Sequence, residues 1–124
     1  MVQWGSNTVL LDAYNANPSS MAAAIDNLLT MNDKKKKVLI LGDMFELGNY
    51  AAEEHQRIVD KLKNYEWEGV YLVGSNFAKT QSPYPQYETF EAFKEVFPTL
   101  SFNNCLLLIK GSRGMALERL IQVK

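Results

Sequence analysis

This sequence of 124 residues has one cysteine, one histidine and no glycine-rich phosphate-binding motif. The one cysteine, Cys105, has no partner for an internal disulfide and precedes an apolar run, so we expect a buried thiol in a reducing compartment. Neither G-x-G-x-x-G nor G-x-x-x-x-G-K-[ST] occurs. This excludes a dinucleotide or P-loop site built by the chain alone. The ligand spacing of zinc sites is also absent, and we expect no metal site.

Charge of one sign and long hydrophobic runs are missing as well. Thirteen basic and 14 acidic residues give a formal net charge of -1, which supplies no electrostatic basis for binding nucleic acid. No window reaches the roughly 18 to 20 apolar residues of a membrane span, and the N-terminus lacks the shape of a signal peptide. We therefore expect a cytoplasmic protein without a membrane partner. The only basic run, 34–37, is expected to be a solvated loop.

Short apolar runs alternate with stretches of helical spacing along the chain. The uncharged runs predict strands at 8–11, 38–41, 70–73 and 105–109, and a short strand at 87–89. Helical spacing predicts helices at 18–31, from 49 to about 64, at 90–97 and from 115 onward. This alternation predicts an α/β fold with a mostly parallel sheet of about five or six strands, helices on both faces and right-handed crossovers. We expect one domain over residues 1–124.

The first strand ends in a polar junction where a parallel sheet would bind a ligand. Asp12 stands at the strand end, where its carboxylate can accept hydrogen bonds from ribose hydroxyls, help to hold a metal, or pair with a backbone N–H of a turn. Asn15 and Asn17 can recognise an amide or a base edge. Asn17 followed by Pro18 also has the form of a helix N-cap with proline in the first turn, which explains both residues without a ligand.

The last strand runs into Lys110-Gly111-Ser112-Arg113-Gly114. Two cations, a hydroxyl and two glycines before a helix N-terminus suit a carboxylate or phosphate, and Arg113 can hold a carboxylate through two hydrogen bonds. The glycines would let the backbone approach such an anion closely. An ordinary tight turn with two solvated cations explains the same residues.

Acidic residues also follow the second strand. Asp43 and Glu46 lie three residues apart, and if their strand neighbours that of Asp12, the three carboxylates can form a metal or general-base site. Asn49 is expected to cap the next helix. His55, the only histidine, falls on the apolar face of that helix, where a packed core residue is the alternative to a site-lining one.

Three segments together resemble the Mur ligase family. They are Asp12 to Met21, Leu41 to Gly48 and Lys110 to Met115. The resemblance covers nearly the whole chain in the same order, and the first segment points to the member that adds D-Ala-D-Ala to UDP-N-acetylmuramoyl-tripeptide. It implies a fragment, the Rossmann-like C-terminal domain of a three-domain ATP-dependent amide ligase of peptidoglycan synthesis. Its partners would be the N-terminal and central domains, and ATP and Mg2+ would be bound mainly by the central domain.

The same resemblance assigns expected roles to site residues. Asp12, Tyr14, Asn15 and Asn17 would lie on the nucleotide side. Ser112 and Arg113, with Lys110 beside them, would bind the D-Ala-D-Ala carboxylate. Asp43, Glu46 and His55 fall on recurring family motifs and are expected to line the site. We expect no catalysis by the chain alone, because the family completes its sites with other domains on closure.

Two other classes share part of the pattern. A signalling receiver-like domain has acids and a lysine at strand ends, as at Asp12, Asp43 and Lys110. Here the third strand ends in Gly74 instead of an aspartate, and glycine rather than proline follows Lys110. A stand-alone module that binds a nucleotide or a small carboxylate without catalysis is the second alternative.

Overall fold

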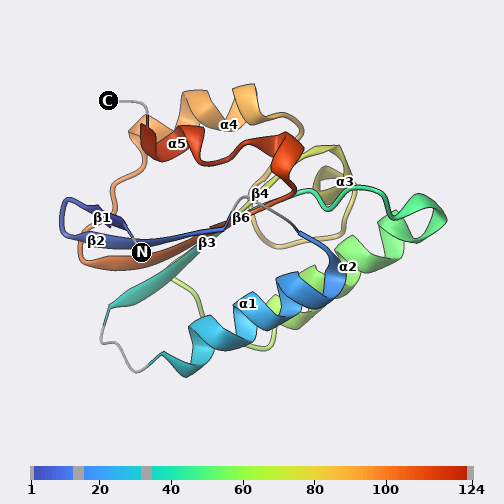
Figure 1. Cartoon of the computed structure of the whole chain (residues 1–124), viewed down its shortest axis with the longest axis horizontal. Helices are drawn as coiled ribbons and strands as arrows, with labels where there is room; N and C mark the ends of the chain where they lie inside the picture. Colours follow the sequence, from blue (N-terminus) through green and yellow to red (C-terminus); the bar gives the residue numbers. More distant parts are fainter. Residues whose placement is uncertain (1, 13–15, 32–34, 123–124) are drawn as a thin grey trace.

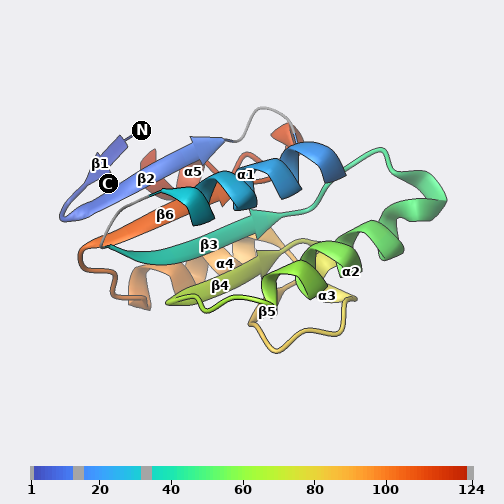
Figure 2. The same cartoon turned by 90° about the horizontal axis from the view of Figure 1, so that it is seen from below.

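One twisted sheet with helices on both faces forms the described part of the chain, residues 2–12, 16–31 and 35–122 of a computed structural model (Figures 1 and 2). The strand order is β1-β2-β6-β3-β4-β5; β1 pairs antiparallel and the remaining pairs are parallel. The strands are β1 (Val2–Trp4), β2 (Asn7–Asp12), β3 (Lys36–Gly42), β4 (Gly69–Val73), β5 (Gln86–Tyr87) and β6 (Cys105–Lys110). The expected α/β fold with a mostly parallel sheet is confirmed.

Helices cover the two faces of the sheet in separate layers (Figure 1). The α-helices are α1 (Pro18–Thr30), α2 (Ala51–Leu62), α3 (Ser75–Ala78), α4 (Phe90–Val96) and α5 (Arg119–Gln122). Short 3-10 turns lie at η1 (Gly48–Tyr50), η2 (Phe97–Thr99) and η3 (Arg113–Met115). Helices α1 and α2 pack on one face and α4 and α5 on the other. None of these helices, within the described residues, is long and apolar enough to cross a membrane.

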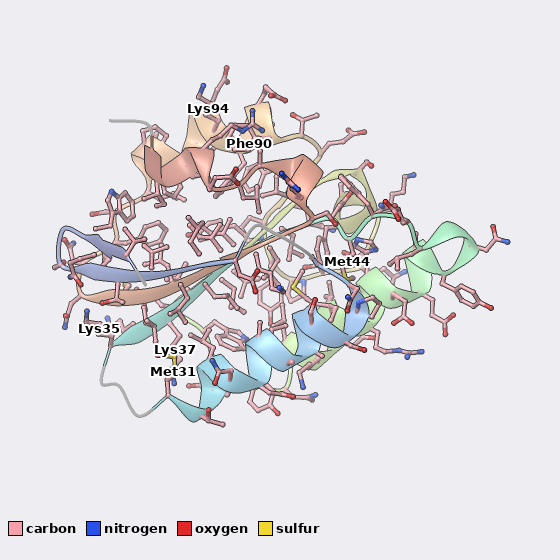
Figure 3. The ribbon with its side chains drawn as sticks, in the orientation of Figure 1. Met31, Lys35, Lys37, Met44, Phe90 and Lys94 are labelled. Atoms are coloured by element: carbon pink, nitrogen blue, oxygen red, sulfur yellow. The ribbon has the colours of Figure 1, made fainter. Side chains whose placement is uncertain are left out.

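The core is split by the sheet into two apolar layers. Met44 belongs to the layer between the sheet and helices α1 and α2, and Phe90 belongs to the layer between the sheet and helices α4 and α5 (Figure 3). Strand β6 is buried along its whole length because it lies between β2 and β3 with helices above and below. A central parallel strand buried on both faces explains the continuous apolar run that ends at Lys110.

Helix α1 begins as its sequence predicts. The Asn17 side chain accepts a hydrogen bond from Ser20 N at 2.8 Å, and Ser20 Oγ accepts from Asn17 N at 3.0 Å, which completes a capping box. Pro18 occupies the first turn, where no backbone donor is needed. Met21, Ile25 and Leu28 face the sheet and are fully buried. The capping role of Asn17 is confirmed.

Two local predictions are wrong, and one strand was not predicted. Lys36 and Lys37 are not in a loop but begin β3, where they pair with β6; the exposed amino end of a strand keeps the Lys36 ammonium in water. Asn49 does not cap α2, since it lies inside the turn η1, whose start at Gly48 has φ +56°. Val2–Trp4 forms an antiparallel edge strand for which no prediction was made, and a turn with Gly5 at φ +62° connects it to β2.

The helix expected from residue 115 onward is interrupted. The chain makes the turn η3, passes through a left-handed conformation at Ala116 (φ 49°) and re-enters a helix only at Arg119. The interruption places Leu117, fully buried, against the backbone of Gly42 and Gly111. No regular helix N-terminus therefore follows directly on Gly114, so the expected helix-dipole contribution to an anion site is absent there.

Candidate functional site

The three sequence motifs meet at the carboxyl edge of β2, β6 and β3. Asp12 is in register with Lys110, and Lys110 with Leu41, so these three strands end side by side. Described residues that follow the three strands line a cleft of about 370 Å³. The lining residues are Ala16, Asn17, Phe45, Glu46, Leu47, Ser112, Arg113 and Gly114. Residues expected on both the nucleotide and the carboxylate side therefore share one cleft.

Ser112 ties the three loops together. Its N–H donates to Asp43 O at 3.0 Å, and its Oγ accepts from Phe45 N at 2.9 Å and donates to Ala16 O at 3.4 Å. The residue is only 7% exposed. A hydroxyl has a single proton, and that proton already has an acceptor. Ser112 thus positions the walls of the cleft, and its hydroxyl would have to give up Ala16 O to donate to a ligand carboxylate.

Replacing Ser112 by alanine is expected to lower the free energy of unfolding by about 1 to 3 kcal/mol, because the part-buried Phe45 N–H loses its acceptor and the contact with Ala16 O is lost. Urea denaturation measures this difference through the shift of the midpoint at constant slope. Ser19→Ala, at an exposed serine of α1, is the matched control and should change the free energy by less than about 0.5 kcal/mol. Equal effects of the two substitutions would contradict the tying role of Ser112.

The glycines of the last junction serve contacts within the protein. A Cβ on Gly111 would lie 3.0 Å from the Gly42 Cα, so the ends of β6 and β3 touch through their backbones. A Cβ on Gly114 would lie 2.8 Å from Cε2 of Phe45. A side chain at Gly111 would require the backbone of Gly42 to shift by a few tenths of an ångström, and one at Gly114 would displace the Phe45 ring. The close approach predicted for these glycines is real, but its partners are β3 and the Phe45 ring.

Arg113 and Glu46 lie at the rim of the cleft with exposed side chains. Glu46 has φ +64°, a conformation that turns the loop after β3 sharply. An exposed guanidinium beside a concave surface can take a carboxylate through two parallel hydrogen bonds. Of the residues that line the cleft, Arg113 is the only cation.

Lys110 does not reach into this cleft. Its side chain is 2% exposed, and Nζ lies 2.7 Å from Asp12 Oδ2. Asp12 remains half-exposed and borders a second groove, on the α1 side of the sheet. Lys110 therefore pairs with Asp12, which was expected on the nucleotide side. The prediction that Lys110 lies beside Arg113 to bind the D-Ala-D-Ala carboxylate does not agree with this pairing. Tyr14 and Asn15, also expected on the nucleotide side, lie outside the described residues.

Asp43 has a capping role. It is 2% exposed, and its two carboxylate oxygens accept from Asn76 N at 2.9 Å and Phe77 N at 3.0 Å, at the start of α3. Strand β6 lies between its strand and that of Asp12, so the expected cluster of Asp12, Asp43 and Glu46 on adjacent strands is wrong. Within the described residues no group of three or more His, Cys, Asp or Glu side chains is placed to hold a metal ion.

His55 is buried in the core and does not line the site. It has 0% exposure, its Nε2 accepts from Met44 N at 2.9 Å, and its Nδ1 lies 2.6 Å from Ala51 O. Because the Met44 amide must donate, the proton of the neutral ring belongs on Nδ1. Asp43 Oδ1 is 3.8 Å from Nε2, too far for a hydrogen bond. The packed-core alternative is correct, and the expectation that His55 lines the site is wrong.

Phe45 is the residue of the cleft that sequence reasoning missed. Its side chain is 44% exposed, although it follows a buried strand. The ring stands over Gly114 and borders both the cleft and a neighbouring hollow of about 330 Å³ that contains Glu88 and Arg119. The available signal was a large aromatic residue between the two acids Asp43 and Glu46.

Family comparison agrees with this arrangement of strand-end loops. The model of the family "Mur ligase, glutamate ligase domain" matches residues 1–113. The chain belongs to this family. The match, together with the capping role of Asp43, removes support from the receiver-like alternative, in which that aspartate would have to be open to modification.

Similar proteins share one description. The chain is 38% identical over 124 residues to a UDP-N-acetylmuramoyl-tripeptide--D-alanyl-D-alanine ligase of Treponema pallidum, a match covering 93% of the chain and 27% of the relative. It is 30% identical over 127 residues to the ligase of that name from Escherichia coli, covering 98% of the chain and 28% of the relative. The chain thus spans about a quarter of the length of these relatives.

Solved structures give the same result. The chain resembles MurF from Acinetobacter baumannii with a TM-score of 0.76 and 28% identity, over 98% of the chain and 28% of that structure. It resembles the MurF ligase from Thermotoga maritima in complex with ADP with a TM-score of 0.73 and 27% identity, over 92% of the chain and 27% of that structure. The fold described above is therefore that of part of a MurF-type ligase.

Proposed function

We propose that this chain is the C-terminal domain of an ATP-dependent ligase that joins D-Ala-D-Ala to UDP-N-acetylmuramoyl-tripeptide in the cytoplasm, as a step of peptidoglycan precursor synthesis. The proposal rests mainly on one observation: the exposed Arg113 shares an open cleft at the carboxyl edge of the sheet with Asn17, which the resemblance assigns to the nucleotide side. The names of the similar ligases and the ADP bound to one of them supply the substrate class.

The proposed chemistry divides between this chain and the rest of the ligase. ATP would activate the carboxylate of the tripeptide as an acyl phosphate, and the amine of D-Ala-D-Ala would displace phosphate to form the amide. Arg113 would hold the carboxylate of the incoming dipeptide, so that its amine points away from this chain. Asp12 would accept hydrogen bonds from the ribose hydroxyls of the nucleotide.

The remaining parts of the reaction are assigned to the N-terminal and central domains of the same ligase. The sequence has no P-loop, so this chain does not cradle the phosphates itself. Mg2+ is assigned to the central domain, as the family resemblance implies. The isolated chain is expected neither to hydrolyse ATP nor to form the amide bond.

Replacing Arg113 by alanine in the full-length ligase is expected to raise the KM for D-Ala-D-Ala by about 10-fold to 100-fold and to leave the KM for ATP within about twofold. The expected loss is that of a charge-assisted bidentate contact, about 1.5 to 3 kcal/mol. Steady-state kinetics with each substrate varied in turn gives both constants. Arg113→Lys should recover only part of the loss, because an ammonium cannot form the paired geometry.

Arg57→Ala is the matched control for this experiment. Arg57 is an exposed arginine of α2 that pairs with Glu53 and lies outside the cleft. Its replacement should leave both KM values unchanged. An unchanged KM for D-Ala-D-Ala in the Arg113→Ala ligase would show that Arg113 does not hold the dipeptide carboxylate.

A further inference from the structure

A lysine is buried at the end of the most apolar strand of the sheet. The five residues of β6 before Lys110 are Cys105, Leu106, Leu107, Leu108 and Ile109, all buried. The Lys110 side chain is itself 2% exposed, and its Nζ donates to Asp12 Oδ2 at 2.7 Å. Two neighbouring parallel strands carry this pair, since Asp12 and Lys110 are in register.

Stability alone does not account for the lysine. Burying an ammonium costs several kcal/mol, and a well-packed apolar side chain at such a position is often as stable or more so than a buried ion pair. The five buried residues before Lys110 show that β6 is packed against apolar side chains on both faces of the sheet. A buried ammonium at the carboxyl end of β6, next to the half-exposed carboxylate of Asp12, indicates a function for that carboxylate.

Asp12 presents its carboxylate to an open groove of about 430 Å³. Its side chain is 47% exposed, and in the part of the chain that the structure describes no donor other than Lys110 contacts it. Small side chains of α1 form one wall of the groove and strand residues form the other. The lining residues are Leu10, Leu11, Asp12, Ser20, Ala23, Ala24, Asn27, Leu108 and Lys110.

We propose that Lys110 is a positioning residue: it holds one oxygen of Asp12 so that the other oxygen accepts the ribose hydroxyls of the bound nucleotide. This inference rests on the proposed function, which gives the groove a nucleotide. Lys110 borders the groove, but its side chain is only 2% exposed and its Nζ is directed at Asp12 Oδ2, so we assign its effect on the ligand to Asp12. Fixing the carboxylate before binding removes the cost of ordering it when the nucleotide arrives.

The test compares ATP with 2′,3′-dideoxy-ATP in the full-length ligase. The wild-type ligase should have a KM for the dideoxy nucleotide about tenfold or more above that for ATP, as expected for lost hydrogen bonds to a charged group. Lys110→Met should raise the KM for ATP about tenfold, leave that for the dideoxy nucleotide within about threefold, and so remove most of the discrimination. Lys110→Arg, which keeps the charge, should retain part of it.

A second ion pair supplies the matched control. Lys61 Nζ also lies 2.7 Å from an aspartate, Asp26 Oδ1, but this pair links α2 to α1 outside the groove. Lys61→Met should leave both KM values unchanged. Lys110→Gln replaces Lys110→Met if the methionine variant does not fold, with the same expected loss of discrimination.

The outcomes separate the positioning role from the function of the ligase. An equal rise in KM for both nucleotides, or wild-type discrimination retained in the Lys110→Met or Lys110→Gln ligase, would overturn the positioning role and leave amide ligation intact. A wild-type ligase that does not distinguish the two nucleotides would also overturn it, because Asp12 would then not accept the hydroxyls. Failure of the wild-type ligase to form the amide bond at all would instead refute the proposed function.

Discussion

Gly74→Ala is expected to lower the free energy of unfolding by about 3 to 5 kcal/mol, the largest stability effect of the substitutions considered. Gly74 has φ +128° and ψ 159°, a combination that costs other residues about 1 to 3 kcal/mol. A Cβ there would lie 2.3 Å from the carboxyl carbon of Asp43. The carboxylate would have to move off the amides of Asn76 and Phe77, and each such charge-assisted bond contributes about 1.5 to 3 kcal/mol.

Urea denaturation of the Gly74→Ala chain measures the loss, and Gly48→Ala is its control. Gly48 also has a positive φ, +56°, but a Cβ there would meet nothing within 4 Å, so only the backbone cost of about 1 kcal/mol is expected. In an Asp43→Ala background the clash is gone, and Gly74→Ala should then cost clearly less than in the wild type. If Gly74→Ala and Gly48→Ala lower the free energy of unfolding by similar amounts, a Cβ at position 74 does not displace the Asp43 carboxylate.

The sequence was sufficient where one physical signal dominated. The uncharged run ending at Ile109 predicted a buried parallel strand because only a strand covered on both faces needs no polar alternation. Asn17-Pro18 predicted the start of α1 because both residues satisfy requirements of the first turn. The edge strand Val2–Trp4 was missed because three residues carry no alternation to detect, and its turn depends on Gly5 alone.

The sequence predicted only part of the candidate site, and it did not predict the contacts among the site residues. The junction from Lys110 to Gly114 was identified as polar chemistry at a strand end, and Arg113 does lie at the cleft. The direction of Lys110 was not readable, since a strand buried on both faces has no polar side to assign. Its pairing with Asp12 depends on strand order, which places β6 beside β2 although 98 residues separate the two side chains.

The carboxyl edge of the sheet carries two open hollows whose walls are fixed by contacts within the protein. The cleft that contains Arg113 is open, and the groove at Asp12 has a carboxylate at its mouth. Ser112 and the backbone contact of Gly42 with Gly111 fix the loops around them without any ligand. Under the proposed function, this edge is a preformed surface whose opposite wall another domain would supply on closure.

His55→Leu is expected to lower the free energy of unfolding by about 2 to 3 kcal/mol. Leucine has no acceptor for the buried Met44 N–H and no donor for Ala51 O, and an unsatisfied buried amide costs about 1 to 3 kcal/mol. The substitution also removes the edge contact of the imidazole with the Phe77 ring, whose centroid lies 4.7 Å away. Urea denaturation at neutral pH measures the combined loss.

His55→Gln separates this structural role from a catalytic one. The glutamine amide offers both an acceptor for Met44 N–H and a donor for Ala51 O, so it should recover a measurable part of the stability that leucine loses. In the full-length ligase, at a temperature where His55→Gln remains folded, the pH dependence of kcat/KM should match that of the wild type, because the buried ring does not reach the cleft. A missing limb of the pH profile in the folded variant would identify His55 as an acid or base of the reaction.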